Sequence, residues 1–377
     1  MLIGDIIAAV EAVAPRSWQE DWDNTGLQIG TPRTECTGVL VCVDVTPEVV
    51  DEAIARKCNL IVSHHPLIFK GLKSLTGRTP VEAAVMNAIA AGVSVYSSHT
   101  ALDNAPGGVS YTMAEKLGAR VLGALSPMKP KWYKLGVMVP VTAAESVRMA
   151  MFDADAGTVA PGGKYDCCSF NTDGTGTFEA QPGAHPYVGK VGELHTEAEV
   201  KVEVMVPYPA LSRVLENMRQ THPYECPAYE LLQPLNPDPA IGLGVTAVLD
   251  ERMKPAQFID HVLKTFGARV ARCSDYTRAM DADTLISRVA MCGGSGGEFI
   301  GDAVAAGAQA YITGDVRYHD FVDRQNDILI IDIGHYETEE CAKDIFYRII
   351  TDKFAGLTVY KSEVGTNPVH YYGETEN

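Results

Sequence analysis

Three short segments gather imidazole and carboxylate side chains at points where buried strands are expected to end. They are SHHP (63–66), SHTALD (98–103) and GHYETE (334–339). Ligand sites in α/β proteins lie beyond the carboxyl ends of parallel strands. A single histidine or a helix-leading glutamate is common without a ligand. Three such clusters at strand ends favour a metal site.

The spacing within these segments selects five candidate metal ligands. Neighbouring side chains in a regular strand point to opposite faces, so His64 and His65 can converge only where Pro66 marks a break. His335 and Glu339 are four residues apart and share one helical face. The predicted ligands are His64, His65, Asp103, His335 and Glu339.

Five ligands suit two ions better than one. A single catalytic zinc usually takes three protein ligands and keeps one open position. A carboxylate that bridges two ions about 3.5–4 Å apart would use all five side chains. We therefore expect two divalent ions per chain. Zinc is preferred, and the mixed nitrogen and oxygen ligands also allow manganese, iron or cobalt.

Other polar residues are candidates for supporting roles. His99 and His319 are expected to orient ligands or transfer protons as catalytic groups, and Asp23 and Asn24 to line the same pocket. Asp315 either lines that pocket or caps a helix. The Gly-rich segment CGGSGG (292–297) suggests a backbone anion nest at Gly293, Gly294, Ser295 and Gly296. A tight turn explains the same glycines equally well.

Composition narrows the class of protein. The 31 Lys and Arg against 48 Asp and Glu give 31 − 48 = −17, which disfavours binding to nucleic acid through a basic patch. The hydrophobic fraction of 46% is that of a globular protein. No apolar run reaches the roughly 18 residues of a membrane span, and the N-terminus does not resemble a secretory signal. Nine scattered cysteines without a C-x-x-C pair indicate reduced thiols and a cytoplasmic location.

The elements that must position these clusters alternate between strands and helices. Helices are predicted at 2–14, at 80–91 and from near 297, 319 and 337. Strands are predicted at 38–45, 59–63, 93–98, 288–292, 310–313 and 328–333. This alternation favours two α/β halves of one domain, with parallel sheets covered on both faces.

The middle of the chain follows another pattern. A strand at 134–139 and a helix at 143–153 precede strand-rich segments and a second helix at 210–220. This β-α-β-β-α-β order predicts a ferredoxin-like α+β unit. Prolines mark both borders. We therefore predict a discontinuous α/β domain at 1–125 and 240–377, interrupted by an insertion at 126–239.

Six segments together resemble the Nif-three-like family (NGG-one-interacting factor three). They are SWQEDWDNTGLQIG, IVSHHPLIFKGLKSL, SSHTALDNAPGGVSYTMAEKLG, MCGGSGG, YITGDVRYHDF and GHYETE. The resemblance covers nearly all of 1–125 and 240–377. It implies a dinuclear metal site whose ligands are the five residues selected above. It also implies a ring-shaped homohexamer that encloses a cavity.

The insertion has a resemblance of its own. THPYECPAYE (221–230) is similar to the HPYE motif of CutA-like, PII-related domains, and GAHPYVGKVGELHTEAEVKVEVMVP resembles the inserted domain of longer bacterial family members. Cys226 stands where those members carry an acidic residue. The resemblance implies a role in assembly or in sensing a small anion, and a packing module is the simpler interpretation. We expect His222 and Glu225 to be structural hydrogen-bonding residues.

Two functions follow from these observations. The first is a metal-dependent hydrolase in which a water between two ions attacks a phosphoester or a nucleotide-like substrate. Members of the family carry the name GTP cyclohydrolase I type 2 homologue, which implies opening of the guanine imidazole ring. The alternative is a non-catalytic, metal-containing regulatory or scaffold ring that binds a protein, a small nucleotide or an anion.

Overall fold

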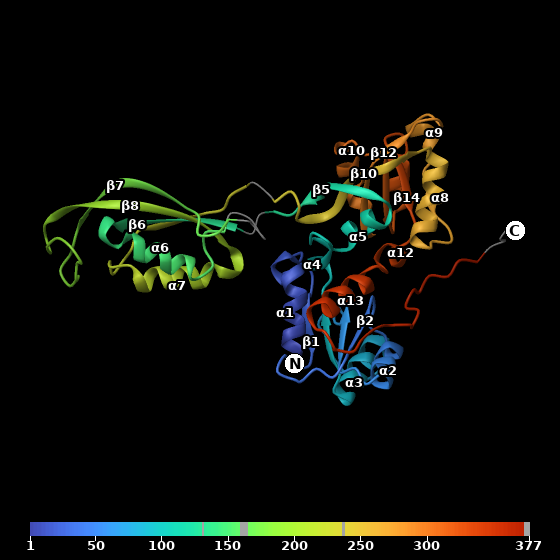
Figure 1. Cartoon of the computed structure of the whole chain (residues 1–377), viewed down its shortest axis with the longest axis horizontal. Coiled ribbons are helices and arrows are strands. Elements are labelled where there is room, and N and C mark those ends of the chain that lie inside the picture. The colour runs from blue at the N-terminus through green and yellow to red at the C-terminus, as the bar shows by residue number, and fades with distance from the viewer. Residues whose placement is uncertain (130–131, 159–164, 236–237, 373–377) are drawn as a thin grey trace. The chain divides into compact units, whose positions relative to one another are not determined.

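The computed structural model describes residues 1–129, 132–158, 165–235 and 238–372, and the chain forms two compact units. One unit contains Met1–Met128 and Pro239–Asn377, and the other contains Lys129–Asp238. Figure 1 shows the first unit in blue, teal, orange and red, and the second in green. The sequence analysis placed the borders of the insertion at 126 and 239.

The first unit contains a mainly parallel five-stranded sheet that carries the first histidine cluster. Its inner strands have every residue buried, as expected for a sheet covered on both faces. In spatial order the strands are β1 (Gly26–Ile29), β4 (Ser94–Ser97), β3 (Leu60–Ser63), β2 (Val39–Cys42) and β15 (Val359–Lys361). Only β1 runs antiparallel to its neighbour.

The second sheet of this unit has six strands. In spatial order they are β11 (Arg272–Cys273), β14 (Leu329–Asp332), β13 (Ala310–Gly314), β12 (Ile286–Ser295), β10 (Gly242–Met253) and β5 (Ala119–Pro127). The three central strands β12, β13 and β14 are parallel, and the other pairings are antiparallel.

The prediction of wholly parallel sheets is therefore wrong at the edges. The strand β5 runs toward the insertion and β10 returns from it, so the two run in opposite directions and pair with each other. Strand direction depends on this long-range connection, which the local pattern of apolar residues does not contain. The mixed α/β class itself is confirmed.

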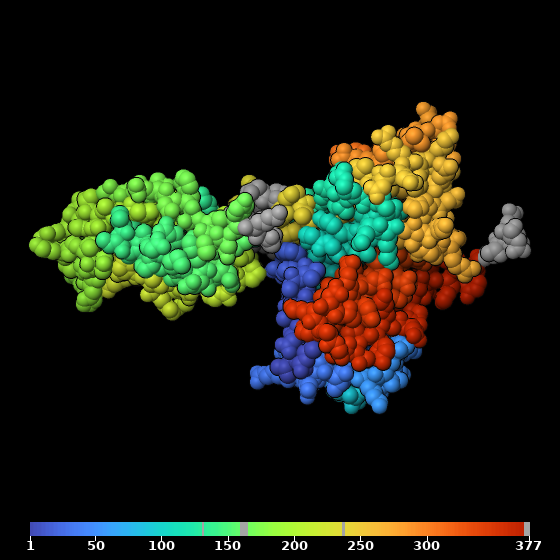
Figure 2. All heavy atoms as spheres, in the orientation of Figure 1, coloured from blue at the N-terminus to red at the C-terminus, as the bar shows by residue number. Residues whose placement is uncertain are grey.

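Helices cover both sheets. Between the sheets, one apolar core joins their facing sides to α1 (Ile3–Val13), α5 (Val109–Lys116), α8 (Pro255–Phe266) and α13 (Ala342–Lys353). On the outer faces lie α2 (Pro47–Ala55) and α3 (Pro80–Ala91) on the first sheet, and α10 (Ile300–Ala305) on the second. Figure 2 shows the C-terminal segment, in red, packed beside the N-terminal segment, in blue.

Local sequence signals explain several helix ends. Thr46 and Thr79 cap α2 and α3 through their hydroxyl oxygens, each followed by a proline in the first turn. Four short helices complete this unit: α4 (Thr100–Asp103), α9 (Tyr276–Ala279), α11 (Tyr318–Arg324) and α12 (His335–Glu339). Among the described residues, none of the helices has both the length and the apolar character needed to cross a bilayer.

The second unit has the β-α-β-β-α-β order expected from the sequence. Its elements are β6 (Trp132–Pro140), α6 (Ala144–Phe152), β7 (Ser169–Glu179), β8 (Leu194–Pro207), α7 (Leu211–Thr221) and β9 (Tyr229–Leu232). They form an antiparallel sheet in the order β7-β8-β6-β9. Both helices pack on one face through a core of valines, alanines and methionines.

Gly108 fixes the junction between α4 and α5. A Cβ atom added there would lie 1.8 Å from the Leu102 carbonyl oxygen and 2.9 Å from that of Ala105. Since these are backbone atoms of the segment that carries Asp103, the segment would have to move. We predict that Gly108→Ala lowers the free energy of unfolding by about 1–3 kcal/mol, measured by urea denaturation. Gly71→Ala is the matched control, because a Cβ there meets nothing within 4 Å. Equal stability of the two variants would contradict the packing explanation.

Candidate metal centre

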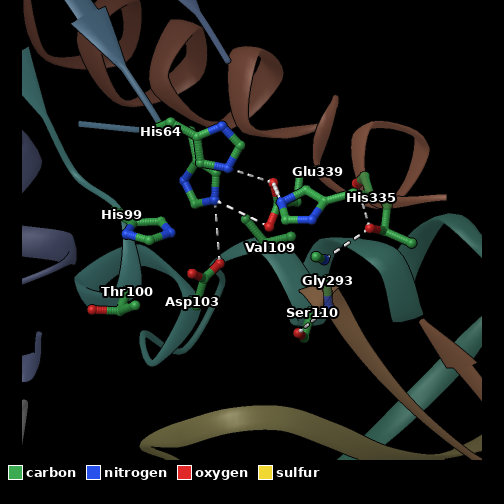
Figure 3. Close-up of polar contacts among 12 residues, drawn as sticks. His64, His99, Thr100, Asp103, Val109, Ser110, Gly293, His335 and Glu339 are labelled. Atoms are coloured by element: carbon green, nitrogen blue, oxygen red, sulfur yellow. Dashed lines mark hydrogen bonds and ion pairs between the residues drawn. The ribbon is translucent and has the colours of Figure 1, made fainter. Parts of the chain in front are cut away.

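The five predicted ligands lie together between the two sheets of the first unit. His64 and His65 follow directly after β3, Asp103 ends α4, and His335 and Glu339 lie one turn apart on α12 (Figure 3). The main chain turns sharply after Ser63, so the two adjacent rings lie side by side with centroids 5.1 Å apart. The chain thus unites residues from widely separated segments.

The ligand atoms form overlapping groups that share Glu339. One group is His64, Asp103 and Glu339, and another is His65, His335 and Glu339. Within each group, one ligand atom per residue lies within 4.8 Å of the others. Glu339 Oε2 is 2.8 Å from His65 Nε2 and 3.1 Å from His335 Nε2, and Glu339 Oε1 is 3.6 Å from His64 Nε2. A carboxylate between two groups is the arrangement that suits a bridging ligand.

Each histidine ring is oriented through its Nδ1 atom. His64 Nδ1 is 3.1 Å from the Ser98 carbonyl oxygen, which can only accept a hydrogen bond. His65 Nδ1 lies 2.7 Å from Asp44 Oδ1, and His335 Nδ1 lies 2.7 Å from Asp315 Oδ2. A hydrogen bond from Nδ1–H leaves the lone pair of Nε2 facing the cluster, as metal-binding histidines require.

Two of the six buried side-chain atoms that have no hydrogen-bond partner in the described part of the chain lie beside each other in this cluster. His64 Nε2 and Asp103 Oδ1 are both enclosed, yet the 3.6 Å between them is too long for a hydrogen bond. Leaving such groups unpaired costs about 1–3 kcal/mol each. A cation between the imidazole lone pair and the two carboxylates would satisfy all of these atoms. The donor set therefore fits a metal ion.

The buried Glu339 carboxylate controls the charge of its neighbours. Burial opposes a charge on His65 and His335, but hydrogen bonds to Glu339 and to Asp44 or Asp315 raise their pKa values to about 10 and about 9. Burial would raise the pKa of Glu339 itself, but the surrounding histidines lower it well below its usual range. Without a metal, the site therefore holds protons in place of a cation.

Asp103 differs from Glu339 in its electrostatic setting. Burial raises the pKa of Asp103, and the nearby Glu339 charge adds to this effect against the attraction of His64. Two carboxylates in one enclosed site repel each other unless positive charge lies between them. The pair is thus arranged for a ligand that brings positive charge.

His99 joins the cluster, and His319 does not. One ring nitrogen of His99 groups with His64 and His65, and its Nδ1 lies 2.8 Å from Asp23 Oδ1. Burial opposes ionisation of Asp23, but its bonds to His99 and Thr100 keep its pKa below the ordinary range. His319 is exposed on α11 with its ring against Tyr318, and no described contact joins it to the cluster. Of the two histidines, only His99 lies in the cluster among the described contacts.

The other predicted pocket residues have distinct roles. Asn24 donates through Nδ2 to the Ile68 carbonyl oxygen at 2.5 Å and so ties together two loops beside the site. Asp315 orients His335, whereas the N-cap of α11 is Arg317. Of the two roles considered for Asp315, the structure does not show the helix cap.

The segment at 293–296, for which an anion nest and a tight turn were equally open, supports the cluster through its first two glycines. The N–H of Gly293 donates to Ser110 Oγ at 3.3 Å and the N–H of Gly294 to Thr338 Oγ1 at 2.8 Å, so neither is free to bind an anion. Gly294 has φ +65°, and a Cβ there would lie 2.2 Å from Glu339 Oε1. The glycine makes room for the shared carboxylate.

Asp44 is a functional residue that the sequence analysis missed. It follows β2 and holds His65, while its other oxygen accepts a hydrogen bond from Thr366 Oγ1 at 3.1 Å. The rule that placed the histidines at strand ends applies equally to Asp44. Asp44 was missed because a single aspartate before a helix-start signal is not distinctive by itself.

The fold and the cluster together define a mixed α/β protein with imidazole and carboxylate groups that could hold metal ions. The family model of Duf34/NIF3 (NGG1p interacting factor 3) matches residues 1–368, and the chain belongs to this family. A relative from Halalkalibacterium halodurans, named GTP cyclohydrolase 1 type 2 homolog, is 36% identical over 368 residues, which are 96% of this chain and 97% of the relative.

Solved structures agree with this assignment. A Bacillus cereus protein related to NIF3 has a TM-score of 0.77 and 33% identity, and the match covers 99% of each chain. A Staphylococcus aureus protein has a TM-score of 0.79 and 28% identity, again with 99% of each chain covered. The whole architecture, insertion included, is therefore shared with solved relatives.

We predict that Asp44→Asn weakens metal binding by about 10–100-fold, because an amide holds His65 less firmly and makes its ring a poorer ligand. Calorimetric titration of the metal-free protein with Zn²⁺ measures this. Asp51→Asn is the control, since Asp51 is exposed on α2. Unchanged affinity in Asp44→Asn would show that the 2.7 Å contact does not support the site.

The raised pKa values predict a pH dependence of the metal-free protein. The folded pKa values of about 10 and about 9 for His65 and His335 exceed the unfolded value of roughly 6.5. Their stabilising effect is thus complete below pH about 6.5 and is lost as the pH rises through the folded pKa values. The free energy of unfolding of the metal-free protein should fall between pH 7 and pH 10, and fall less in His335→Asn. A rise over this range would contradict the prediction.

Proposed function

We propose that this protein is a metal-dependent hydrolase that acts on a nucleotide-like or phosphoester substrate. The observation that carries the proposal is the pair of ligand groups that share Glu339, one of which contains the unpaired His64 Nε2 and Asp103 Oδ1. Two divalent ions, with zinc as the first choice, would bind to His64, His65, Asp103, His335 and Glu339. When bound, they would supply an activated water and stabilise developing negative charge.

His99 is the residue that would transfer protons in this proposal. Its Nδ1 is held by Asp23, so its Nε2 is directed toward the ligand groups. Asp23 accepts further hydrogen bonds from the Thr100 backbone at 3.0 Å and the Thr100 hydroxyl at 2.5 Å. These bonds fix the carboxylate, which in turn fixes the tautomer and direction of the imidazole. A histidine–aspartate pair of this kind can accept a proton from a nucleophile and return it to a leaving group.

Two exposed aromatic side chains beside His99 favour a substrate with a planar ring. Trp22 is 61% exposed and Phe69 is 45% exposed, yet the rings lie 5.9 and 6.4 Å from the His99 ring. Their backbones are held close together, because Asn24 and Gln28 bond to the carbonyl oxygen and the N–H of Ile68. Rigid exposed aromatic faces next to a polar site suit stacking on a nucleobase.

The names of the relatives point the same way. The Halalkalibacterium halodurans protein and a Bacillus subtilis relative that is 35% identical are both named GTP cyclohydrolase 1 type 2 homolog. These names suggest a guanine nucleotide as the first substrate to test. The ring-opening reaction itself would need the same activated water and proton transfer as a phosphoester hydrolysis.

The test is a turnover assay of the zinc-loaded protein on GTP and a panel of phosphoesters. We expect His65→Ala and Glu339→Gln each to lower turnover by at least about a hundredfold, since each removes a ligand. Glu340→Gln should not change it, because that side chain pairs with Lys343 outside the cluster. Trp22→Ala should raise KM about tenfold with little change in kcat, and Trp22→Phe should retain most of the affinity.

Two results would overturn the hydrolase. One is turnover that survives in both ligand variants. The other is the absence of turnover by a fully metal-loaded protein, which would favour the alternative of a regulatory or scaffold ring that binds a nucleotide or protein partner without chemistry.

Two further proposals rest on the family resemblance. One is a homohexameric ring, which light scattering of the purified protein would distinguish from smaller assemblies. The other is a CutA-like insertion with a role in assembly, supported by its β-α-β-β-α-β order. An insertion whose removal leaves the mass of the assembly unchanged would contradict that role.

A further inference from the structure

The insertion contains a cavity of its own, remote in sequence from the metal ligands. Its volume is about 690 Å³, within the range of small-molecule sites. It is lined by the end of the β7–β8 hairpin, by the loop at 184–187 and by the segment at 224–228. All of these belong to the second compact unit, so the cavity is complete within that unit.

The cavity lies on the side of the sheet that carries no helices. Val200, Val202 and Val204 of β8 pack into the core beneath α6 and α7. Side chains alternate along a strand, so Glu199 of β8 lies on the opposite face. Phe178 on β7 pairs with His195, which has the same parity as Glu199 and so lies on that face too.

Two copies of the tripeptide His-Pro-Tyr build its aromatic wall. They are residues 185–187 and 222–224. The Tyr187 and Tyr224 rings lie 6.4 Å apart at 55°, and the Phe178 ring lies 5.8 Å from that of Tyr224 at 60°. Tyr187 is 54% exposed, which gives a ligand access to the ring faces.

His222 holds this wall and takes no part in binding. It accepts a hydrogen bond at Nδ1 from the Tyr224 backbone at 3.0 Å and therefore donates from Nε2 to the Met138 carbonyl oxygen at 2.9 Å. Burial lowers the pKa of this imidazole, in keeping with the neutral form. The structural role expected of His222 is thus explained, and the second tyrosine is fixed in place.

The charged groups of the cavity are all carboxylates. Glu179, Glu199 and Glu225 line it, and the described lining residues include no lysine or arginine. Glu199 Oε1 accepts a hydrogen bond from the Tyr224 hydroxyl at 2.9 Å, and Glu225 Oε2 accepts one from the His185 backbone at 3.0 Å. The nearest lysine on β8, Lys201, is paired with Glu203 and Glu230.

From this juxtaposition we propose that the cavity binds a small organic cation with a quaternary ammonium group. The faces of aromatic rings attract weakly hydrated cations, and tyrosine and phenylalanine walls are the usual means of recognising methylated ammonium groups. The carboxylates supply the opposite charge, and the Tyr224 hydroxyl directs one of them. An anion would meet the carboxylates of Glu199 and Glu225, and the described lining residues include no lysine or arginine to compensate them. The insertion would then be a sensor of a cationic metabolite, independent of whether the metal centre is catalytic.

The test is calorimetric titration of the full chain with choline and with its neutral carbon isostere, 3,3-dimethylbutan-1-ol. Choline should bind with one site per chain, and the isostere should bind about tenfold more weakly or not at all. Equal binding of the two molecules would overturn the proposal. So would no binding of choline at concentrations up to about 50 mM.

Variants separate the ring faces from the charge. Tyr224→Leu and Glu199→Gln should each weaken choline binding about tenfold, and Tyr224→Phe should retain more affinity than Tyr224→Leu because it keeps the ring. Glu203→Gln is the control, since this residue lies on the same strand and face but pairs with Lys134 and Lys201 outside the cavity. Circular dichroism confirms that each variant is folded. An equal loss of choline affinity in Glu203→Gln would show that net charge causes the effect, and it would overturn the proposed site.

A binding experiment with lipid vesicles distinguishes two sources of the ammonium group, a lipid headgroup and a soluble metabolite. Co-sedimentation with phosphatidylcholine vesicles that free choline abolishes would assign a lipid headgroup. Binding of free choline without co-sedimentation would assign a soluble metabolite, as the size of the cavity favours.

Discussion

The carboxylate of Glu339 is the charge around which the first unit is organised. It is buried, and a buried carboxylate is stable only where positive or hydrogen-bonding groups compensate its lost hydration. Three histidines supply that compensation, two from the end of β3 and one from α12. The backbone must also approach the carboxylate closely, which Gly294 permits because it lacks a side chain. The sheet order, the sharp turn after β3 and the short helix α12 together bring the compensating groups to the Glu339 carboxylate.

Around the ligands lies a second set of residues, whose oxygen atoms accept hydrogen bonds from the histidine rings and fix their orientation. Ser98, Asp44 and Asp315 take the Nδ1 side of each ring, so the Nε2 side is free for a ligand. The C-terminal segment contributes as well, because Thr366 bonds to Asp44 and Asn367 bonds to Glu337 on α12. The segment therefore connects the part of the site after β2 with the part on α12.

The sequence predicted which imidazole and carboxylate side chains would cluster, because their residue types are scarce and their positions follow a rule of sheet topology. His64, His65, Asp103, His335 and Glu339 each follow or lie near the end of a strand that the apolar pattern marks clearly. Asp44 obeys the same rule but stands alone, so composition gave it no weight. The two interpretations of Gly293 and Gly294 stayed open because a glycine pattern does not show whether its N–H groups are free. The antiparallel pairing of β5 with β10 escaped prediction because it depends on a connection of more than a hundred residues.

That pairing has a consequence for how the chain tolerates its own insertion. Pro127 and Gly242 are direct partners in the ladder, so the chain leaves the first unit and re-enters it at one point. The entropy of closing a loop grows only with the logarithm of its length, so a hundred intervening residues add little to the cost of a short turn. The inserted unit is in effect a very long hairpin loop that has a core of its own. Its sequence can change while the strands that support the histidine cluster keep their register.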